Sequence, residues 1–256
     1  MSEDNLKYAI DYLTRVNRIN IKGNEYNFET FRALMNITLP NNLIDEYYQA
    51  QDTIIQNSYK NKTIVDVDEL IPIKNNIYLW QGDITLIKAD AIVNAANSDL
   101  LGCFYPLHNC IDNAIHSFAG LQVRRDLMKI MSFQKKKEPS GRAKITKGYN
   151  LPSKYIIHTV EPIVKGKVTK ENENDLYNCY MSCLKIAEEY NIESIVFCSI
   201  STGIYAYPIT KACKIALKAV DDYFVNNLSN IKKVIFNVFK KEEYDVYNRE
   251  IKRDDF

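Results

Sequence analysis

Apolar residues recur at helical spacing through the first quarter of the chain. The spacing runs from Tyr8 to Val16 and continues in the segments FETFRALMNITL and LIDEYYQAQDTIIQNSY, which Pro40 helps to separate. A polar link, KNKTI, and the segment VDVDELIPI follow. This pattern predicts a helical N-terminal extension over residues 1–75.

The pattern changes after residue 76, where short apolar runs rich in β-branched residues alternate with longer helical patterns. The predicted strands are residues 77–84, 89–97, 155–160, 194–200 and 232–239, and the predicted helices are residues 113–130, 173–191, 209–227 and 241–251. Such alternation indicates an α/β fold with a largely parallel sheet. In such sheets ligands bind at the carboxyl ends of the strands, so we expect residues 76–256 to form a ligand-binding domain with its site there.

Composition and charge narrow the possible partners. The formal net charge is +1, which argues against a protein whose task is to bind nucleic acid. No apolar run approaches the roughly 20 residues needed to cross a bilayer, and the polar N-terminus lacks a signal-peptide pattern. The sequence therefore predicts a cytoplasmic protein without a membrane partner.

The segment LGCFYPLHNC carries an unusual concentration of metal-ligating residues. Cys103, His108 and Cys110 fall within eight consecutive residues of a chain that has six cysteines and three histidines. Thiolates and an imidazole suit Zn²⁺, and three protein ligands would leave a fourth position open. A structural zinc site with a fourth protein ligand and a set of free thiols are the alternatives. The other cysteines have apolar neighbours and are predicted to be small core residues: Cys179, Cys183, Cys198 and Cys213.

The loop SISTGIYAYP lies between a predicted strand and a predicted helix. Its backbone N–H groups could bind a phosphate near the positive end of that helix. A simple turn with a helix cap is equally compatible with the segment taken alone.

Five segments together are more specific. QGDIT, DAIVNAAN, IDNAIHSFAG, GRAKITKGYNLPSKYIIHTV and ISTGIYAYP occur in this order, and the chain resembles a macrodomain, the ADP-ribose-binding fold, over about Ile77 to Ile251. The resemblance implies a three-layer α/β/α domain with a mixed, largely parallel sheet.

The segment GCFYPLHNC replaces the glycine-rich run of most macrodomains. It resembles the zinc-containing subgroup of macrodomain hydrolases that occurs alongside class M sirtuins, and members of that subgroup also carry a helical N-terminal extension. The resemblance implies Zn²⁺ as cofactor, Cys103, His108 and Cys110 as its ligands, and a sirtuin-type ADP-ribosyltransferase as a functional partner.

The resemblance also assigns roles at the adenine end of the ligand. Asp83 would accept a hydrogen bond from the adenine amino group, with a strand-end turn as the alternative role. Ile84 would contact the adenine with its backbone. Phe239 would stack on the base, although a core or helix-staple phenylalanine is a close alternative.

Further residues match the ribose and diphosphate positions. Asn97 would hold the distal ribose, and Asp112 would assist substrate positioning or catalysis unless it caps a helix. The diphosphate loop would consist of Ser201, Thr202, Gly203, Ile204 and Tyr205.

Three residues near these positions are expected to have structural roles, and the backbone geometry of a fourth is open. Asn94 is expected to fix the loop backbone, and His116 and His158 are expected to be packing residues. Many macrodomains have glycine where this chain has Ala206, so the shape of the loop depends on the φ angle there.

Two functions follow from the resemblance. The first is a zinc-dependent hydrolase that removes mono-ADP-ribose from protein side chains, with Asp- and Glu-linked esters as the expected substrates. The second is a reader module that binds ADP-ribose without turnover. An open metal site favours the hydrolase, because a reader has little need of one.

Overall fold

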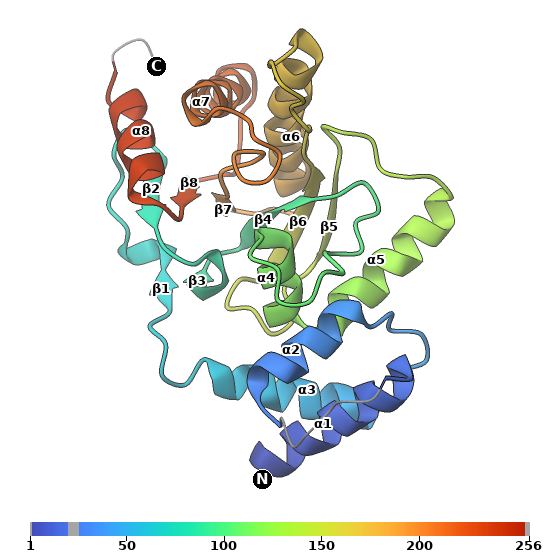
Figure 1. Ribbon diagram of the computed structural model, residues 1–256. Helices are drawn as coiled ribbons and strands as arrows, with labels where there is room; N and C mark the ends of the chain where they lie inside the picture. Colours follow the sequence, from blue (N-terminus) through green and yellow to red (C-terminus); the bar gives the residue numbers. More distant parts are fainter. Residues whose placement is uncertain (1, 20–25, 254–256) are drawn as a thin grey trace.

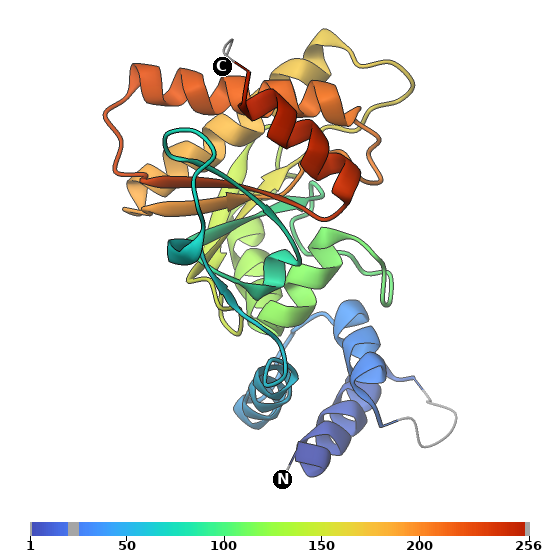
Figure 2. The same ribbon diagram turned by 90° about the vertical axis from the view of Figure 1, so that its left-hand side faces the viewer.

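The computed structural model describes residues 2–19 and 26–253, and shows a sheet between two helical layers (Figures 1 and 2). The helices are α1 (Ser2–Asn17), α2 (Phe28–Ile37), α3 (Asp45–Ser58), α4 (Ile111–Ala119), α5 (Leu121–Gln134), α6 (Lys170–Glu189), α7 (Ile209–Asn226) and α8 (Lys241–Ile251), with short 3₁₀ turns η1 (Val67–Glu69) and η2 (Ile84–Leu86). The strands are β1 (Val65–Asp66), β2 (Ile77–Gln81), β3 (Ile87–Lys88), β4 (Ala91–Ala96), β5 (Ala143–Lys147), β6 (Tyr155–Val160), β7 (Ser194–Phe197) and β8 (Lys233–Val238). No helix within these ranges is long and apolar enough to cross a membrane.

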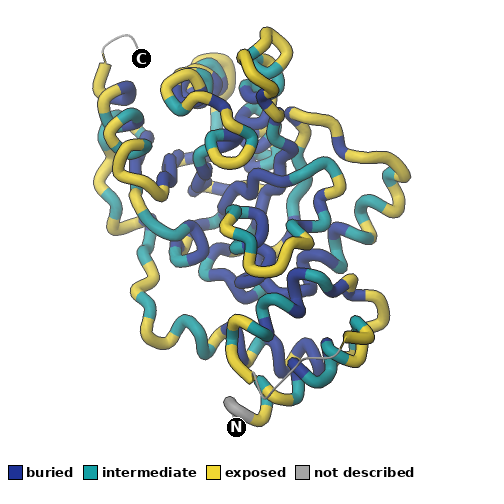
Figure 3. The backbone as a smooth tube through the Cα atoms, in the orientation of Figure 1, coloured by how far each residue is buried: buried dark blue, intermediate teal, exposed yellow. Residues whose placement is uncertain are grey.

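The main sheet has the strand order β2-β8-β7-β4-β6-β5. All neighbouring pairs are parallel except β5 with β6, so the expected mixed, largely parallel sheet is confirmed. Helices α6, α7 and α8 cover one face, and α4 and α5 cover the other (Figure 2). The central strand β4 is buried along its whole length, and the dark core in Figure 3 follows the sheet. The carboxyl ends of the parallel strands therefore meet at one edge.

The N-terminal extension is helical, as predicted, and α1–α3 pack below the α4–α5 layer (Figure 1). Buried polar side chains join the two parts. Gln51 Nε2 donates to Gln122 Oε1 at 2.7 Å, and Asn36 Nδ2 donates to Ser117 Oγ at 2.9 Å. Buried polar groups need such partners, so these bonds specify how the extension sits.

The structure departs from the predicted elements in several places, and the strand expected over residues 194–200 ends at Phe197. The single helix expected over residues 113–130 is two helices, because Gly120 adopts a φ of 98° between α4 and α5, which L side chains rarely adopt. The strand expected over residues 77–84 ends at Gln81, because Asp83 begins the turn η2. The edge strand β5 was not predicted, since it gains its strand geometry only by antiparallel pairing with β6.

Candidate functional site

A cleft of about 600 Å³ opens at the carboxyl ends of the central strands. It brings together the loops that follow β4, β6, β7 and β8. Its lining residues are Ala95, Asn97, Gly102, Cys103, Phe104, His108, Asn109, Cys110, Ile111, Asp112, Glu161, Cys198, Ser199, Thr202, Gly203, Ile204, Tyr205, Asn237, Phe239, Lys240 and Glu243. Segments far apart in the sequence thus share one cavity, as expected for an α/β sheet.

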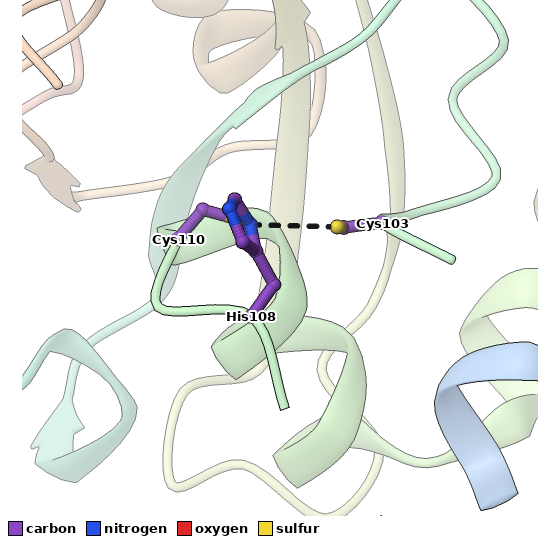
Figure 4. Close-up of side chains that lie close together, drawn as sticks. All are labelled: Cys103, His108 and Cys110. Carbon is purple, nitrogen blue, oxygen red and sulfur yellow. Dashed lines mark hydrogen bonds between the residues drawn. The ribbon is translucent and has the colours of Figure 1, made fainter. Parts of the chain in front are cut away.

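The three predicted metal ligands lie together on one side of this cleft. Cys103 Sγ is 3.6 Å from His108 Nδ1, and the two side chains point toward each other (Figure 4). The ligand atoms of Cys103, His108 and Cys110 all lie within 4.8 Å of one another. All three side chains are partly buried. The sequence cluster is therefore also a spatial cluster.

The donor set fits a zinc ion. Zinc held tetrahedrally by a thiolate and an imidazole would separate the sulfur and nitrogen atoms by about 3.6 Å, the spacing of Cys103 and His108. In the part of the chain that the structure describes, this group contains no fourth Cys, His, Asp or Glu. Burial raises the pKa of the Cys110 thiol to about 12, opposed by the N–H of Asn113. A bound cation would have to displace that proton, as metals do at thiol ligands.

Local backbone geometry places the cluster. Gly102 has a φ of 83°, and a Cβ at this position would lie 2.9 Å from the His116 ring, so only glycine fits. Cys110 is the N-cap of α4, and its Sγ accepts a hydrogen bond from the N–H of Asn113 at 3.4 Å. The alternative role of Asp112 as the helix cap is therefore wrong. Asp112 is one of the residues that line the cleft.

Asp112 is a buried carboxylate held by neutral neighbours. Asn94 Nδ2 donates to Asp112 Oδ1 at 2.8 Å and lies 3.2 Å from His158 Nδ1, so Asn94 binds these side chains and not the loop backbone that we expected. His116 Nε2 lies 3.5 Å from Asp112 Oδ1. Burial, followed by the charge of Arg124, holds the pKa of His116 well below its usual range, so this imidazole is neutral. Burial raises the pKa of Asp112 to about 6, which the N–H of Asn94 opposes.

The two histidines outside the cluster are buried, as expected for packing residues. His158 Nε2 lies 2.9 Å from Thr146 Oγ1, which joins β6 to the edge strand β5. The four remaining cysteines are also buried: Cys179, Cys183, Cys198 and Cys213.

Asn97 directly follows β4 and begins the loop that leads to Cys103. Its Nδ2 donates to the carbonyl of Gly102 at 3.1 Å, and its Oδ1 accepts from the N–H of Asp99 at 3.0 Å. The amide thus links the end of β4 to the metal-ligating segment. Its proposed contact with a ribose stays a prediction.

The loop after β7 forms another part of the cleft wall. Thr202, Gly203, Ile204 and Tyr205 line the cleft, whereas Ser201 is buried and is not among its lining residues. Thr202 Oγ1 donates to the carbonyl of Ser199 at 2.9 Å, which tightens the turn.

Two residues of this loop have a left-handed backbone. Ser201 has a φ of 65° and Ala206 a φ of 57°, so the geometry that glycine favours is present at Ala206 despite its methyl group. The left-handed conformation costs a non-glycine residue about 1–2 kcal/mol. The loop keeps its shape at that cost.

Glu161 is a cleft residue that the sequence analysis missed. It follows β6 directly, and its Oε2 accepts a hydrogen bond from the N–H of Ser201 at 2.6 Å. Burial raises its pKa to about 7, with a further increase from Asp112 that the Ser201 N–H opposes. A carboxylate at the carboxyl end of a predicted strand was the available sequence signal. Its bond to the loop after β7 exists only in the folded chain.

We expect Glu161→Gln to stabilise the metal-free protein at pH 8. The folded-state pKa of Glu161, about 7, lies above the usual value of 4.5. The free energy of unfolding therefore falls as pH rises from 4.5 to 7, and above pH 7 the protein bears the full cost of the buried charge. An amide carries no such penalty and can still accept from Ser201. Thermal unfolding should show a Tm several degrees higher at pH 8 and no difference near pH 4. Equal Tm values at both pH values would contradict the buried charge.

The residues assigned to the adenine end divide into two groups. Asp83 Oδ1 accepts hydrogen bonds from the N–H of Thr85 at 2.9 Å and from its hydroxyl at 2.8 Å, so Asp83 makes the strand-end turn that was the alternative to its adenine role. Ile84 is buried, and neither Asp83 nor Ile84 is among the cleft-lining residues. Phe239 lines the cleft and is 74% exposed, so it is not a core residue. The adenine contacts themselves stay predictions.

Comparison with known proteins places this site in a family. The Macro domain family model matches residues 93–216. A protein-ADP-ribose hydrolase of Staphylococcus aureus strain MSSA476 is 45% identical over 229 residues, which cover 89% of this chain and 85% of that protein. A structure of the Oceanobacillus iheyensis macrodomain with ADP has a TM-score of 0.62 and 34% identity, and covers 72% of this chain and 94% of that one. A Trypanosoma brucei macrodomain in complex with ADP has a TM-score of 0.65 and 27% identity, and covers 95% of this chain and 96% of that one. The chain belongs to the Macro domain family.

Proposed function

We propose that this protein is a hydrolase that removes mono-ADP-ribose from modified protein side chains, with zinc as cofactor and Asp- or Glu-linked esters as substrates. The observation that carries the proposal is the shared cleft, in which Cys103, His108 and Cys110 lie on one wall and the loop after β7 on another. The relative from S. aureus, named a protein-ADP-ribose hydrolase, supports the reaction. The resemblance to the sirtuin-linked subgroup also supports a sirtuin-type ADP-ribosyltransferase as functional partner.

Residues of the cleft would contact each part of such a substrate. Backbone N–H groups of Thr202, Gly203 and Ile204 would bind the diphosphate, and Tyr205 would lie along the distal ribose. These remote contacts supply binding energy that fixes the reacting bond in place. Phe239, at the exposed rim, would stack on the adenine.

Two side chains of the cleft would act at the reacting end. Asn97 would hold a hydroxyl of the distal ribose, because an amide can both donate and accept there. Asp112 would orient a water molecule or accept its proton, since a carboxylate held by Asn94 is fixed in direction. A zinc ion held by the two cysteines and His108 would supply a Lewis acid that orients and polarises the ribose oxygen.

The test is release of ADP-ribose from target proteins labelled at defined side chains. We expect the zinc-loaded protein to remove label from an Asp- or Glu-modified target faster than from a Ser- or Arg-modified one. Retention of label on every target, together with tight binding of free ADP-ribose, would instead identify a reader. Equal rates on all linkages would exclude the proposed ester preference.

We expect Asp83→Asn to weaken ADP-ribose binding by about 1.5–3 kcal/mol, the value of a hydrogen bond to a charged acceptor. An asparagine Oδ1 can still accept from Thr85, so the turn survives, but the new amide nitrogen cannot accept from an adenine amino group. Calorimetry gives the affinity, and an unchanged Tm shows that the turn is intact. An unchanged affinity in this variant would remove Asp83 from the binding site.

A further inference from the structure

The end of α2 contacts the segment that carries the metal ligands, residues 101–110, here called the cysteine–histidine loop. Asn36 is only 1% exposed, and its Oδ1 accepts a hydrogen bond from the N–H of Leu107 at 2.9 Å. Leu107 has a φ of 56°, a left-handed conformation that costs a non-glycine residue about 1–2 kcal/mol. Leu107 directly precedes His108, so its backbone sets the direction of the imidazole. Asn36 thus stabilises an otherwise unfavourable conformation beside a metal ligand.

The same amide begins a chain of hydrogen bonds through α4. Asn36 Nδ2 donates to Ser117 Oγ at 2.9 Å, and Ser117 Oγ donates to Asn113 Oδ1 at 3.3 Å. Asn113 Nδ2 donates to the carbonyl of Tyr105 at 3.0 Å, and its backbone N–H donates to Cys110 Sγ at 3.4 Å. The second half of the cysteine–histidine loop is therefore tied to α2 both directly and through α4.

Arg124 ties the first half of the loop to the same helix end. Its Nε donates to the carbonyl of Leu101 at 2.7 Å, and its guanidinium carbon lies 4.3 Å from the centre of the Phe104 ring. Its Nη1 donates to the carbonyls of Met35 at 2.9 Å and Thr38 at 2.6 Å. The Met35 carbonyl also accepts from the N–H of Thr38. The buried Arg124 therefore adds bonds to two carbonyls at the α2 end and bonds one in the loop.

We propose that the N-terminal extension is part of the metal site's scaffold, with Asn36 and Arg124 as positioning residues that hold the cysteine–histidine loop in its metal-binding geometry. The proposal rests on the proposed zinc site and adds a task for α2. Groups that support metal ligands from behind fix the direction of those ligands, and their loss typically costs about 10–100-fold in metal affinity.

The test measures the affinity of the full-length, metal-free protein for Zn²⁺ alone, by competition with a chelator. We expect Asn36→Leu, which keeps the side-chain size but removes both hydrogen bonds, to weaken zinc binding by about 10–100-fold. Asn36→Asp keeps the acceptor for the Leu107 N–H and should recover most of the affinity. Ser117→Ala breaks the second link with little change in packing, and should weaken zinc binding by several-fold even if Asn36→Leu does not fold.

Gln51→Leu is the matched control. Gln51 is a buried amide of the same extension that bonds Gln122 and the N–H of Leu121. Among the described residues, none of its hydrogen bonds reaches the cysteine–histidine loop. It should lower the Tm and leave zinc affinity unchanged. Equal losses of zinc affinity in Asn36→Leu and Gln51→Leu would reduce the role of Asn36 to general stability and overturn the proposal.

Cys103→Ala in the same assay separates the two proposals. If Cys103→Ala loses zinc while Asn36→Leu and Ser117→Ala bind it as tightly as the unmodified protein, the positioning role is wrong and the zinc site stands. If Cys103→Ala itself binds zinc normally, the metal site is elsewhere and both proposals fail.

Discussion

Cys103→Ala and His108→Ala should each abolish stoichiometric zinc binding and reduce turnover by more than about 100-fold, because losing a direct ligand costs more than losing a residue that only supports one. The two ligand atoms are 3.6 Å apart, so removing either one leaves a two-ligand remnant with Cys110. The fold should persist, since both side chains are only partly buried at the cleft. Metal analysis of the purified variants and release of ADP-ribose from an Asp- or Glu-modified target measure the two effects.

Cys213→Ala is the control for the loss of a thiol. Cys213 is buried on α7 and does not line the cleft, so its removal should leave both zinc content and turnover unchanged. Normal turnover by Cys103→Ala in a preparation verified to be free of metal would refute a catalytic role for zinc. Loss of turnover with zinc still bound would show instead that the thiol acts without the metal.

Asp112→Asn should reduce kcat by about 10²-fold or more, the usual cost of losing a general acid or base. The asparagine Oδ1 can still accept from Asn94, so the side chain keeps its position while losing its charge. A neutral amide also avoids the cost of burying a carboxylate, and we expect no loss of Tm at pH 8. Single-turnover kinetics on the labelled target gives the rate of the chemical step, and calorimetry with ADP-ribose gives the binding.

The same variant distinguishes catalysis from binding. A role in proton transfer predicts that ADP-ribose affinity and zinc content stay close to those of the unmodified protein. A large loss of affinity with an unchanged chemical step would make Asp112 a binding residue. An unchanged rate of ester hydrolysis would remove it from the mechanism altogether.

Local signals in the sequence were sufficient for the layered fold. The buried strands β4, β6 and β8 are short β-branched runs, and helices α6 and α7 follow clear apolar spacing, so both periods could be recognised along the chain. The break at Gly120 and the edge strand β5 were missed. The break depends on the backbone φ angle of Gly120 alone, and the strand β5 depends on pairing with β6.

The sequence by itself determined the fold class, the helical extension and the identity of the candidate metal ligands, because hydrophobic period and residue chemistry are local properties. Only the tertiary structure decided that these ligands share a cleft with the loop after β7. It also decided that Glu161 accepts a hydrogen bond from that loop, and that Asn36 accepts one from the backbone N–H of Leu107, next to His108. The last two contacts join residues 40 and 71 positions apart in the chain. Such distant pairs meet only when burial of the sheet and helix faces brings their elements together, so no local pattern could have predicted them.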